Sequence, residues 1–222
     1  MRYVQGSVKA KTITFLKAAT LTAGLAPLGW LLHRGWQSYR GVGEGLGANP
    51  VEKVTHTTGD WTLYLLLLTL AVTPLRQVRG LGWLVRFRRM LGLLAFMYGT
   101  LHLTTYVFDR AYVELALDLK GLAADLAKRP FITVGALAYV LMVPLAITST
   151  SGMIRRLGRR WQLLHRLIYA VAALGVVHFA WLVKADLRRP LLLGAVLLGL
   201  MLVRLRLWSR APLGRVRSRV GR

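Results

Sequence analysis

The sequence predicts an all-α integral membrane protein, a bundle of six transmembrane helices with both termini in the cytoplasm. Hydrophobic residues make up 55% of the 222 residues, which is more than a soluble domain carries. The mean hydropathy is also positive, at +0.48. The net charge of +23 comes from 31 Lys and Arg against 8 Asp and Glu. Because these charges separate apolar runs, we interpret them as a membrane topology signal rather than a nucleic-acid surface.

Six apolar segments are candidates for these helices, because a span needs about 20 apolar residues. They cover residues 12–32, 56–75, 90–108, 131–148, 163–183 and 190–207, in a single domain of residues 1–222. The first is long for the apolar part of a signal peptide, so we expect it to be retained. The second needs residues before Trp61 to reach full length, and the sixth needs Arg204 and Arg206 to snorkel to the membrane surface. Residues 209–222 are expected to form a basic tail.

The distribution of charge predicts the orientation, because short cytoplasmic loops carry the Lys and Arg. The N-terminus, the second loop, the fourth loop and the chain from Arg204 onward together hold 19 basic residues and no acidic one. The other three connections, residues 33–60, 109–129 and 184–189, hold all eight acidic residues. This segregation fits an even number of spans with cytoplasmic termini.

The outer connection at residues 109–129 has leucines at positions 115, 119, 122 and 126. This spacing suits a helix on the outer membrane surface. A segment that only caps the bundle fits the spacing equally well.

The absence of Cys limits the chemistry. Iron–sulfur clusters, covalent c-type heme, Cys-ligated zinc and Cys nucleophiles are excluded. Any cofactor must be held by His, Arg or the backbone. His33 and His56 lie at or beyond the outer boundary, where a His is usually a polar surface residue, whereas the other three His lie within predicted spans. An ionisable group inside a span is costly and marks a functional site by default.

His102 and His178 are predicted to ligate a heme. They lie on the third and fifth spans, which run in the same direction and carry them to similar depths in the outer half of the membrane. Two such His can supply both axial ligands of a heme between the helices. Small residues share their helix faces and leave room for it, although the same pattern also suits a tight helix contact. These residues are Gly92, Ala95 and Gly99 before His102, and Gly175 before His178.

His165 lies 13 residues before His178, about 20 Å nearer the cytoplasmic side along a straight helix. The two rings would point about 140° apart around that helix, so the backbone must adjust for both to face the bundle. The matching positions on the third span are Arg88 and Arg89, which suit a heme propionate or a flavin phosphate. The residues leave three interpretations open: a heme with one His, an anionic flavin or quinone site, or an interfacial His with basic neighbours.

Other readings are weaker. Residues 43–48 fit the dinucleotide fingerprint G-x-G-x-x-A, but no strand precedes them. A self-sufficient metal reductase would need a nicotinamide-binding domain that the chain lacks. A proton relay or small transporter through buried His is the alternative to heme binding. Against it, we expect no buried Asp or Glu in the spans and see no inverted repeat.

Several stretches resemble the MsrQ family, also called YedZ, over roughly residues 10–205. They are Gly47–Glu52, Thr57–Trp61, Leu68–Leu75, Arg88–Gly92, Leu101–Thr104, Thr148–Met153, Arg159–Tyr169 and His178–Lys184. That family contains the heme-binding membrane subunits of bacterial protein-methionine-sulfoxide reductase systems. It belongs to the ferric-reductase-like transmembrane superfamily.

The resemblance implies a multi-pass protein of the bacterial inner membrane that carries one or two b-type hemes, with FMN also ascribed to the family. It implies electron transfer from the quinone pool, or from a cytosolic flavin reductase, to the periplasmic molybdopterin enzyme MsrP. Sulfoxide reduction in oxidised periplasmic proteins would then take place on that partner. His102, His165 and His178 match the family's intramembrane histidines. NADPH oxidases of the superfamily carry a second His where this chain has Arg88 or Arg89, so a bis-His inner heme is in doubt.

Overall fold

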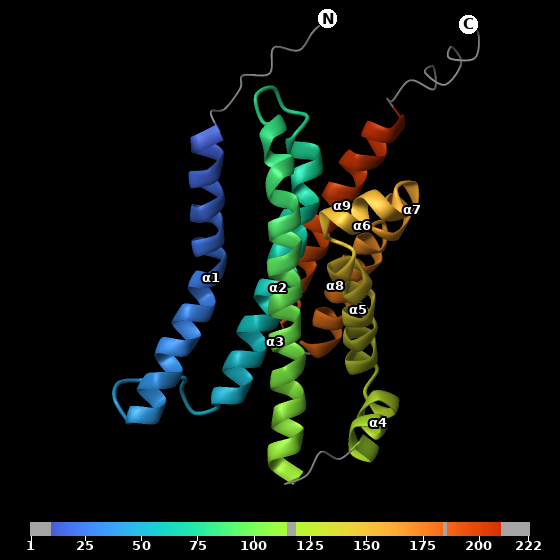
Figure 1. Cartoon of the computed structure of the whole chain (residues 1–222). Helices are drawn as coiled ribbons and strands as arrows, with labels where there is room; N and C mark the ends of the chain where they lie inside the picture. Colours follow the sequence, from blue (N-terminus) through green and yellow to red (C-terminus); the bar gives the residue numbers. More distant parts are fainter. Residues whose placement is uncertain (1–9, 115–118, 184–185, 210–222) are drawn as a thin grey trace, which may run out of the picture.

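The computed structural model describes residues 10–114, 119–183 and 186–209, and the all-α prediction is confirmed (Figure 1). The helices are α1 Ala10–Arg40, α2 Pro50–Leu75, the short 3-10 helix η1 Gly82–Phe87, α3 Arg88–Glu114, α4 Leu119–Lys128, α5 Pro130–Ile147, α6 Ser151–Leu157, α7 Arg159–Leu164, α8 Leu167–Leu182 and α9 Arg188–Ser209. The expected tail falls outside the described residues, apart from Ser209 at the end of α9.

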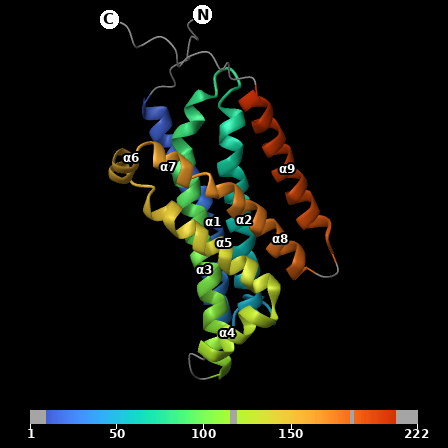
Figure 2. The same ribbon diagram turned by 90° about the vertical axis from the view of Figure 1, so that its right-hand side faces the viewer.

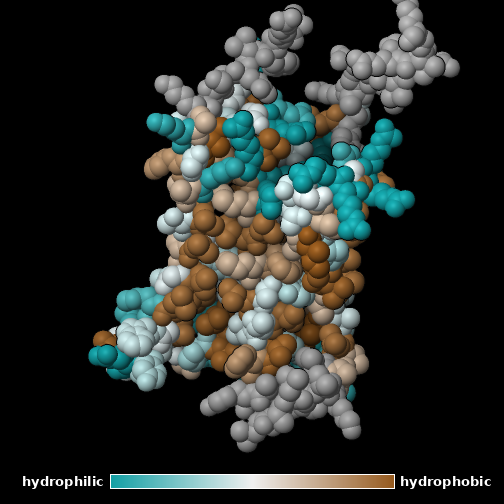
Figure 3. Space-filling view, viewed as in Figure 1, coloured by the Kyte–Doolittle hydropathy of each residue, from teal (hydrophilic) through white to brown (hydrophobic). Residues whose placement is uncertain are grey.

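The prediction of six spans is also confirmed, because six helical segments are long and apolar enough to cross a membrane. They are Ala10–Arg40, Pro50–Leu75, Gly82–Asp109, Pro130–Ile147, Arg159–Leu182 and Arg188–Leu207. In the space-filling view, hydrophobic side chains form a belt around the middle of the visible face (Figure 3). Hydrophilic side chains gather at the end where α6 and α7 lie.

Two helices extend further than their apolar runs. The first was expected to end at residue 32, but α1 continues to Arg40. Gly41 then stops it, because its φ of +63° directs the chain out of the helix while the Val42 amide bonds back to the Gln37 carbonyl at 3.0 Å. The second helix begins at Pro50 rather than at residue 56, since Asn49 caps it by accepting a hydrogen bond from the Glu52 amide at 3.1 Å.

The fifth span is interrupted where the sequence predicted a continuous helix over residues 163–183. The chain turns at His165 and Arg166, so that α7 ends at Leu164 and α8 begins at Leu167. A backbone adjustment was expected between His165 and His178 if both rings face the bundle, and the break lies between them along the chain.

The helices pack as two close pairs, α2 with α3 and α5 with α8, and α9 lies against α2 and α8 (Figures 1 and 2). The core between them consists of leucines with small residues that let the helices approach. Ala95, Val171 and Ala172 are fully buried, and Leu65 and Leu70 are 2% and 1% exposed. Close packing of this kind holds polar side chains at fixed depths.

Helix α1 lies at the edge of the bundle and is fixed through Tyr98 of α3 (Figure 1). The hydroxyl of this fully buried residue donates to the Gly24 carbonyl at 2.8 Å and accepts from the Leu28 amide at 3.2 Å. It therefore occupies the place of the helical bond between those two groups, next to Pro27. The Tyr98 hydroxyl thus joins α3 to the turn of α1 in which the regular helical hydrogen bond is replaced.

The basic connections lie at one end of the bundle. The start of α1, the loop between α2 and α3, the pair α6 and α7, and the end of α9 are all at this end, which we call the basic end (Figures 1 and 2). The opposite end holds α4 in the connection where the leucine spacing suggested a helix. Of those leucines, Leu115 falls outside the described residues. The hydroxyl of Thr133 on α5 donates to the Leu126 carbonyl and ties α4 to α5.

Candidate functional site

The structure brings His102 and His178 together in the half of the bundle opposite the basic end. His102 lies on α3 and His178 on α8, and their ring centres are 6.0 Å apart with the ring planes at 82°. Both residues are partly buried. The two residues are 76 positions apart in the sequence, so only the packing of the helices makes them neighbours.

Each imidazole is oriented by a backbone carbonyl of another helix. Nδ1 of His102 lies 2.9 Å from the Thr55 carbonyl oxygen on α2. Nδ1 of His178 lies 2.6 Å from the Phe131 carbonyl oxygen on α5. Because a carbonyl can only accept, each Nδ1 must carry the proton and donate it. In the neutral ring this leaves the lone pair on Nε2, which is the arrangement found in metal-binding His.

Two glycines make these contacts sterically feasible. Gly59 and Gly135 each follow the carbonyl residue by four positions, so each lies one helical turn further along the same face. A Cβ at Gly59 would lie 3.1 Å from ring atoms of His102. A Cβ at Gly135 would lie 2.7 Å from Nδ1 and 2.8 Å from Cε1 of His178. Each ring therefore lies directly on helix backbone that only glycine leaves open.

The sequence analysis did not identify Gly59 or Gly135 as site residues and selected Gly92, Gly99 and Gly175 instead. In the structure these three lie near apolar side-chain atoms of neighbouring helices, and Gly92 also lines a cavity beside His165. The nearest atoms to a Cβ built on each are Thr69 Cγ2 at 3.9 Å for Gly92, Thr62 Cγ2 at 3.5 Å for Gly99 and Leu63 Cδ1 at 3.4 Å for Gly175. A shared face on one helix could not reveal which residue of another helix meets the ring.

The spacing of the two rings fits a heme. An imidazole nitrogen binds a first-row metal at about 2 Å and the ring centre lies about 1 Å further, so two imidazoles across one metal have centres about 6 Å apart. The observed separation is 6.0 Å. Two neutral imidazoles with Nε2 lone pairs are the donor set that the axial positions of a b-type heme require.

A second site lies toward the basic end, around His165. A cavity of about 300 Å³ between α3, α5 and α7 is lined in part by Arg88, Arg89, Gly92, Trp161 and His165. The sequence analysis expected Arg88 and Arg89 to face His165, and the structure places all three at one cavity. Two guanidinium groups beside an imidazole favour an anionic ligand.

Thr148 and Trp161 both contact the His165 ring. Its Nε2 lies 3.0 Å from the Thr148 hydroxyl, which donates its own proton to the Pro144 carbonyl at 2.6 Å. Nε2 of His165 is therefore the donor in that contact. The indole of Trp161 stacks on the ring with centres 4.0 Å apart and donates Nε1–H to the Thr148 carbonyl at 2.9 Å. Coordination through Nε2 would require His165 to release Thr148.

A partly exposed acidic residue, Asp60, lies close to the His pair on the second span. Asp60 lies where the predicted second span, residues 56–75, overlaps the outer connection, and in the structure it is inside α2 with its side chain 22% exposed. Arg189 on α9 donates to the Asp60 carboxylate at 2.7 Å and to the Tyr64 hydroxyl at 2.7 Å. The pair neutralises the charge of the carboxylate, and Asp60 still exerts an electrostatic influence on His102.

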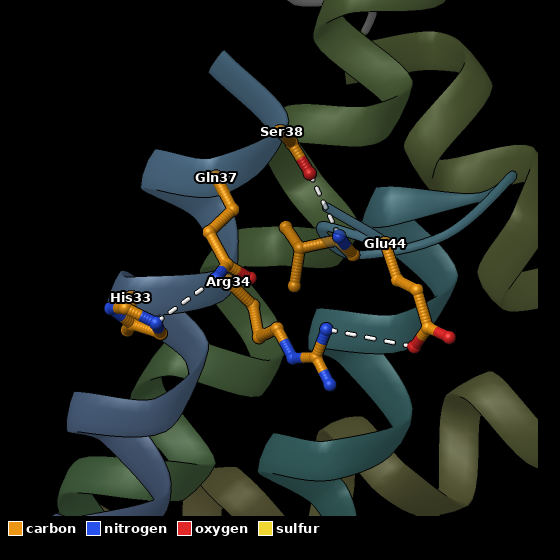
Figure 4. A network of polar contacts seen from close by, with 6 residues as sticks. His33, Arg34, Gln37, Ser38 and Glu44 are labelled. Carbon is orange, nitrogen blue, oxygen red and sulfur yellow. Dashed lines mark hydrogen bonds and ion pairs between the residues drawn. The ribbon is translucent and has the colours of Figure 1, made fainter. Parts of the chain in front are cut away.

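The two remaining His are exposed and lie outside both sites. His33 on α1 contacts Gln37 through its Nε2 at 3.1 Å (Figure 4). The same view shows Arg34 of α1 directed toward Glu44, with 3.7 Å between the charged groups. Glu44 belongs to the glycine-rich segment 43–48, which is a loop between two helices and not a strand-to-helix turn. His56 is exposed on α2.

Comparisons with known proteins agree on one family. Residues 58–176 match the family described as "Ferric reductase like transmembrane component". The "Protein-methionine-sulfoxide reductase heme-binding subunit MsrQ" of Herminiimonas arsenicoxydans is 48% identical over 196 residues, which cover 86% of this chain and 85% of that protein. The subunit of the same name from Xanthomonas campestris pv. campestris strain 8004 is 46% identical over 215 residues, covering 95% and 94%. That of Xanthomonas axonopodis pv. citri strain 306 is 48% identical over 208 residues, covering 90% and 91%.

Proposed function

Because this chain belongs to the MsrQ family of ferric-reductase-like heme-binding subunits, we propose that it transfers electrons across a membrane to a protein-methionine-sulfoxide reductase. The observation that carries the proposal is the His102–His178 pair, with ring centres 6.0 Å apart. This spacing suits one metal held between two helices. The relatives named above are described as heme-binding subunits of the same reductase system.

His102 and His178 would hold the heme through Nε2, and the heme would supply one-electron chemistry at its iron. The carbonyls of Thr55 and Phe131 keep both protons on Nδ1 and fix the ring orientations. Gly59 and Gly135 allow the rings to reach those carbonyls. Arg189 of α9 pairs with Asp60 of α2, so the carboxylate next to the site is not left without a counter-charge.

The charge of the two ends supports an orientation of the chain in the membrane, and this orientation gives the direction of electron transfer. We propose that the basic end faces the cytoplasm, which puts both termini there, and that the membrane is the bacterial inner membrane. Electrons would enter from a membrane quinol or a cytosolic flavin reductase near the basic end. They would leave near the His102–His178 pair toward a periplasmic molybdopterin reductase of the MsrP type, on which sulfoxide reduction takes place.

The inner cavity supports a second cofactor position. Its volume of about 300 Å³ is at the lower end of the range of ligand pockets. Arg88 and Arg89 supply charge for heme propionates or for the phosphate of FMN. We propose one of these groups as its occupant, beside His165.

The heme assignment is tested by the absorbance of the purified chain. We expect a reduced-minus-oxidised spectrum of low-spin b-type heme, and we expect His102→Ala or His178→Ala to remove most of it. His56→Ala is the matched control, because His56 is exposed on α2 and should leave the spectrum unchanged. If an alanine variant fails to fold, His178→Met should retain a heme with an altered axial-ligand spectrum. A colourless wild-type preparation from heme-replete cells would refute the assignment and favour a proton relay through the same His.

His165→Ala tests the inner cavity separately. Loss of about half of the heme would assign a second heme there. Loss of bound flavin with unchanged heme would assign FMN. If neither quantity changes, the proposal of an inner cofactor is wrong, while the His102–His178 site stands.

A further inference from the structure

Arg204 of α9 carries a buried guanidinium group with unused hydrogen-bond donors. Its Nε and Nη1 atoms are buried and donate to no acceptor in the part of the chain that the structure describes. The group lies over the ring of Tyr169 on α8, with 4.8 Å between the guanidinium carbon and the ring centre. Unsatisfied buried donors are costly, and those of a charged group most of all. An anion at this position would remove the cost.

Two more arginines lie near Arg204, from two other helices. Arg76 caps the end of α2, and Arg88 is the first residue of α3. Arg88 and Arg204 repel each other, and Arg76 repels both. No ion pair joins any of the three to an acidic residue within the described ranges. The three side chains therefore concentrate positive charge at one place on the basic end.

The sequence places no acidic side chain in the segments that form this end. The N-terminal segment, the loop between α2 and α3, the segment of α6 and α7, and the chain from Arg204 onward contain no Asp or Glu. Mutual repulsion and buried donors are tolerated together where an external anion binds. The position borders the inner cavity, because Arg88 also lines that cavity whereas Arg76 and Arg204 do not.

We propose that Arg76, Arg88 and Arg204 bind the phosphate of an anionic phospholipid at the basic end. The guanidinium fork matches phosphate oxygens in geometry and charge. Basic pockets between transmembrane helices on the cytoplasmic side are where such headgroups bind. Exposed leucines elsewhere on the surface of α9, Leu198, Leu202 and Leu205 at 60%, 52% and 58%, show that this helix presents apolar surface to acyl chains. Free phosphate and a heme carboxylate are also anions that bind guanidinium groups, and the experiments give each of them its own outcome.

The test measures lipid retained by the full-length protein. The chain is purified into nanodiscs that contain phosphatidylglycerol and phosphatidylcholine in equal amounts, and bound lipid is counted by native mass spectrometry after release. We expect a clear preference for phosphatidylglycerol and about a fivefold loss of that preference in Arg204→Met. Arg206→Met is the matched control, since Arg206 is exposed on the same helix and should retain the preference. An equal loss in both variants would overturn the site in favour of general surface charge.

Two further readouts keep the proposal testable if Arg204→Met folds poorly. Phosphatidylglycerol should raise the melting temperature of the wild-type chain, whereas phosphatidylcholine and inorganic phosphate should not. Equal stabilisation by inorganic phosphate would overturn the lipid as the source of the anion. Heme content should be the same in Arg204→Met and wild type. A loss of heme without a loss of bound lipid would overturn the proposal by assigning the arginine to a heme carboxylate. Failure of heme binding in the wild type would leave the lipid result unaffected.

Discussion

The substitution Gly135→Ala tests how the helix backbone positions the heme ligands. The new Cβ would lie 2.7 Å from Nδ1, 2.8 Å from Cε1 and 3.2 Å from Cγ of His178. Carbon atoms in ordinary contact are about 3.5–4.0 Å apart. The ring is rigid, so His178 must move by roughly 1 Å, and its 2.6 Å hydrogen bond to the Phe131 carbonyl must lengthen or break.

The expected cost is a 10- to 100-fold weaker affinity for heme, which is the usual effect of removing a partner that orients a metal-binding His. Helix propensity alone predicts a more stable helix, because replacing Gly by Ala inside a helix stabilises it by about 0.5–1 kcal/mol, and it gives no reason for weaker heme binding. A loss of heme affinity therefore identifies the contact with His178 as the cause.

Heme titration into apo-protein, followed by absorbance, measures this affinity. Gly59→Ala should have a smaller effect, since its Cβ would lie 3.1 Å from the His102 ring. Gly199→Ala on α9 should have none, because nothing lies within 4 Å of its Cβ. Circular dichroism verifies that each variant remains helical. Wild-type affinity in a folded Gly135→Ala protein would show that the reasoning is wrong.

Two other substitutions test the surroundings of the site. Asp60→Asn removes a negative charge that acts on His102 and should raise the midpoint potential of the heme by about 20–60 mV, since about 1 kcal/mol corresponds to roughly 43 mV per electron. Redox titration measures this shift, Glu52→Gln on the same helix is the control, and a lowered potential would contradict the electrostatic argument. Tyr98→Phe removes the hydroxyl that joins α3 to α1 and should cost about 1–3 kcal/mol of stability. A melting temperature equal to that of the exposed control Tyr39→Phe would show that α1 is held by other contacts.

Much of the architecture could be predicted from the sequence because bilayer thickness and charge segregation act on short stretches of chain. Apolar runs of the required length gave six helices, and each has a counterpart in the structure. The ends were less predictable. Helix α1 extends to Arg40 and α2 begins at Pro50, since caps and glycines set these ends and hydropathy does not register them.

The sequence also indicated which residue types carry the chemistry. His102, His165 and His178 stood out because ionisable groups inside a membrane span are expensive. Asp60 was counted with the acidic residues of the outer connection, and its position beside His102 was not predicted. Its pairing with Arg189, 129 positions away, could not be foreseen from either segment.

The sequence by itself determined the helices, the segregation of charge and the His candidates, because each depends on residue type and on spacing along one segment. Only the tertiary structure decided what each imidazole touches. The glycines on the faces of His102 and His178 pack against other helices, while Gly59 and Gly135 on neighbouring helices admit the rings. Helical periodicity gives the direction of a side chain from its own axis, but the residue it meets depends on how two helices cross.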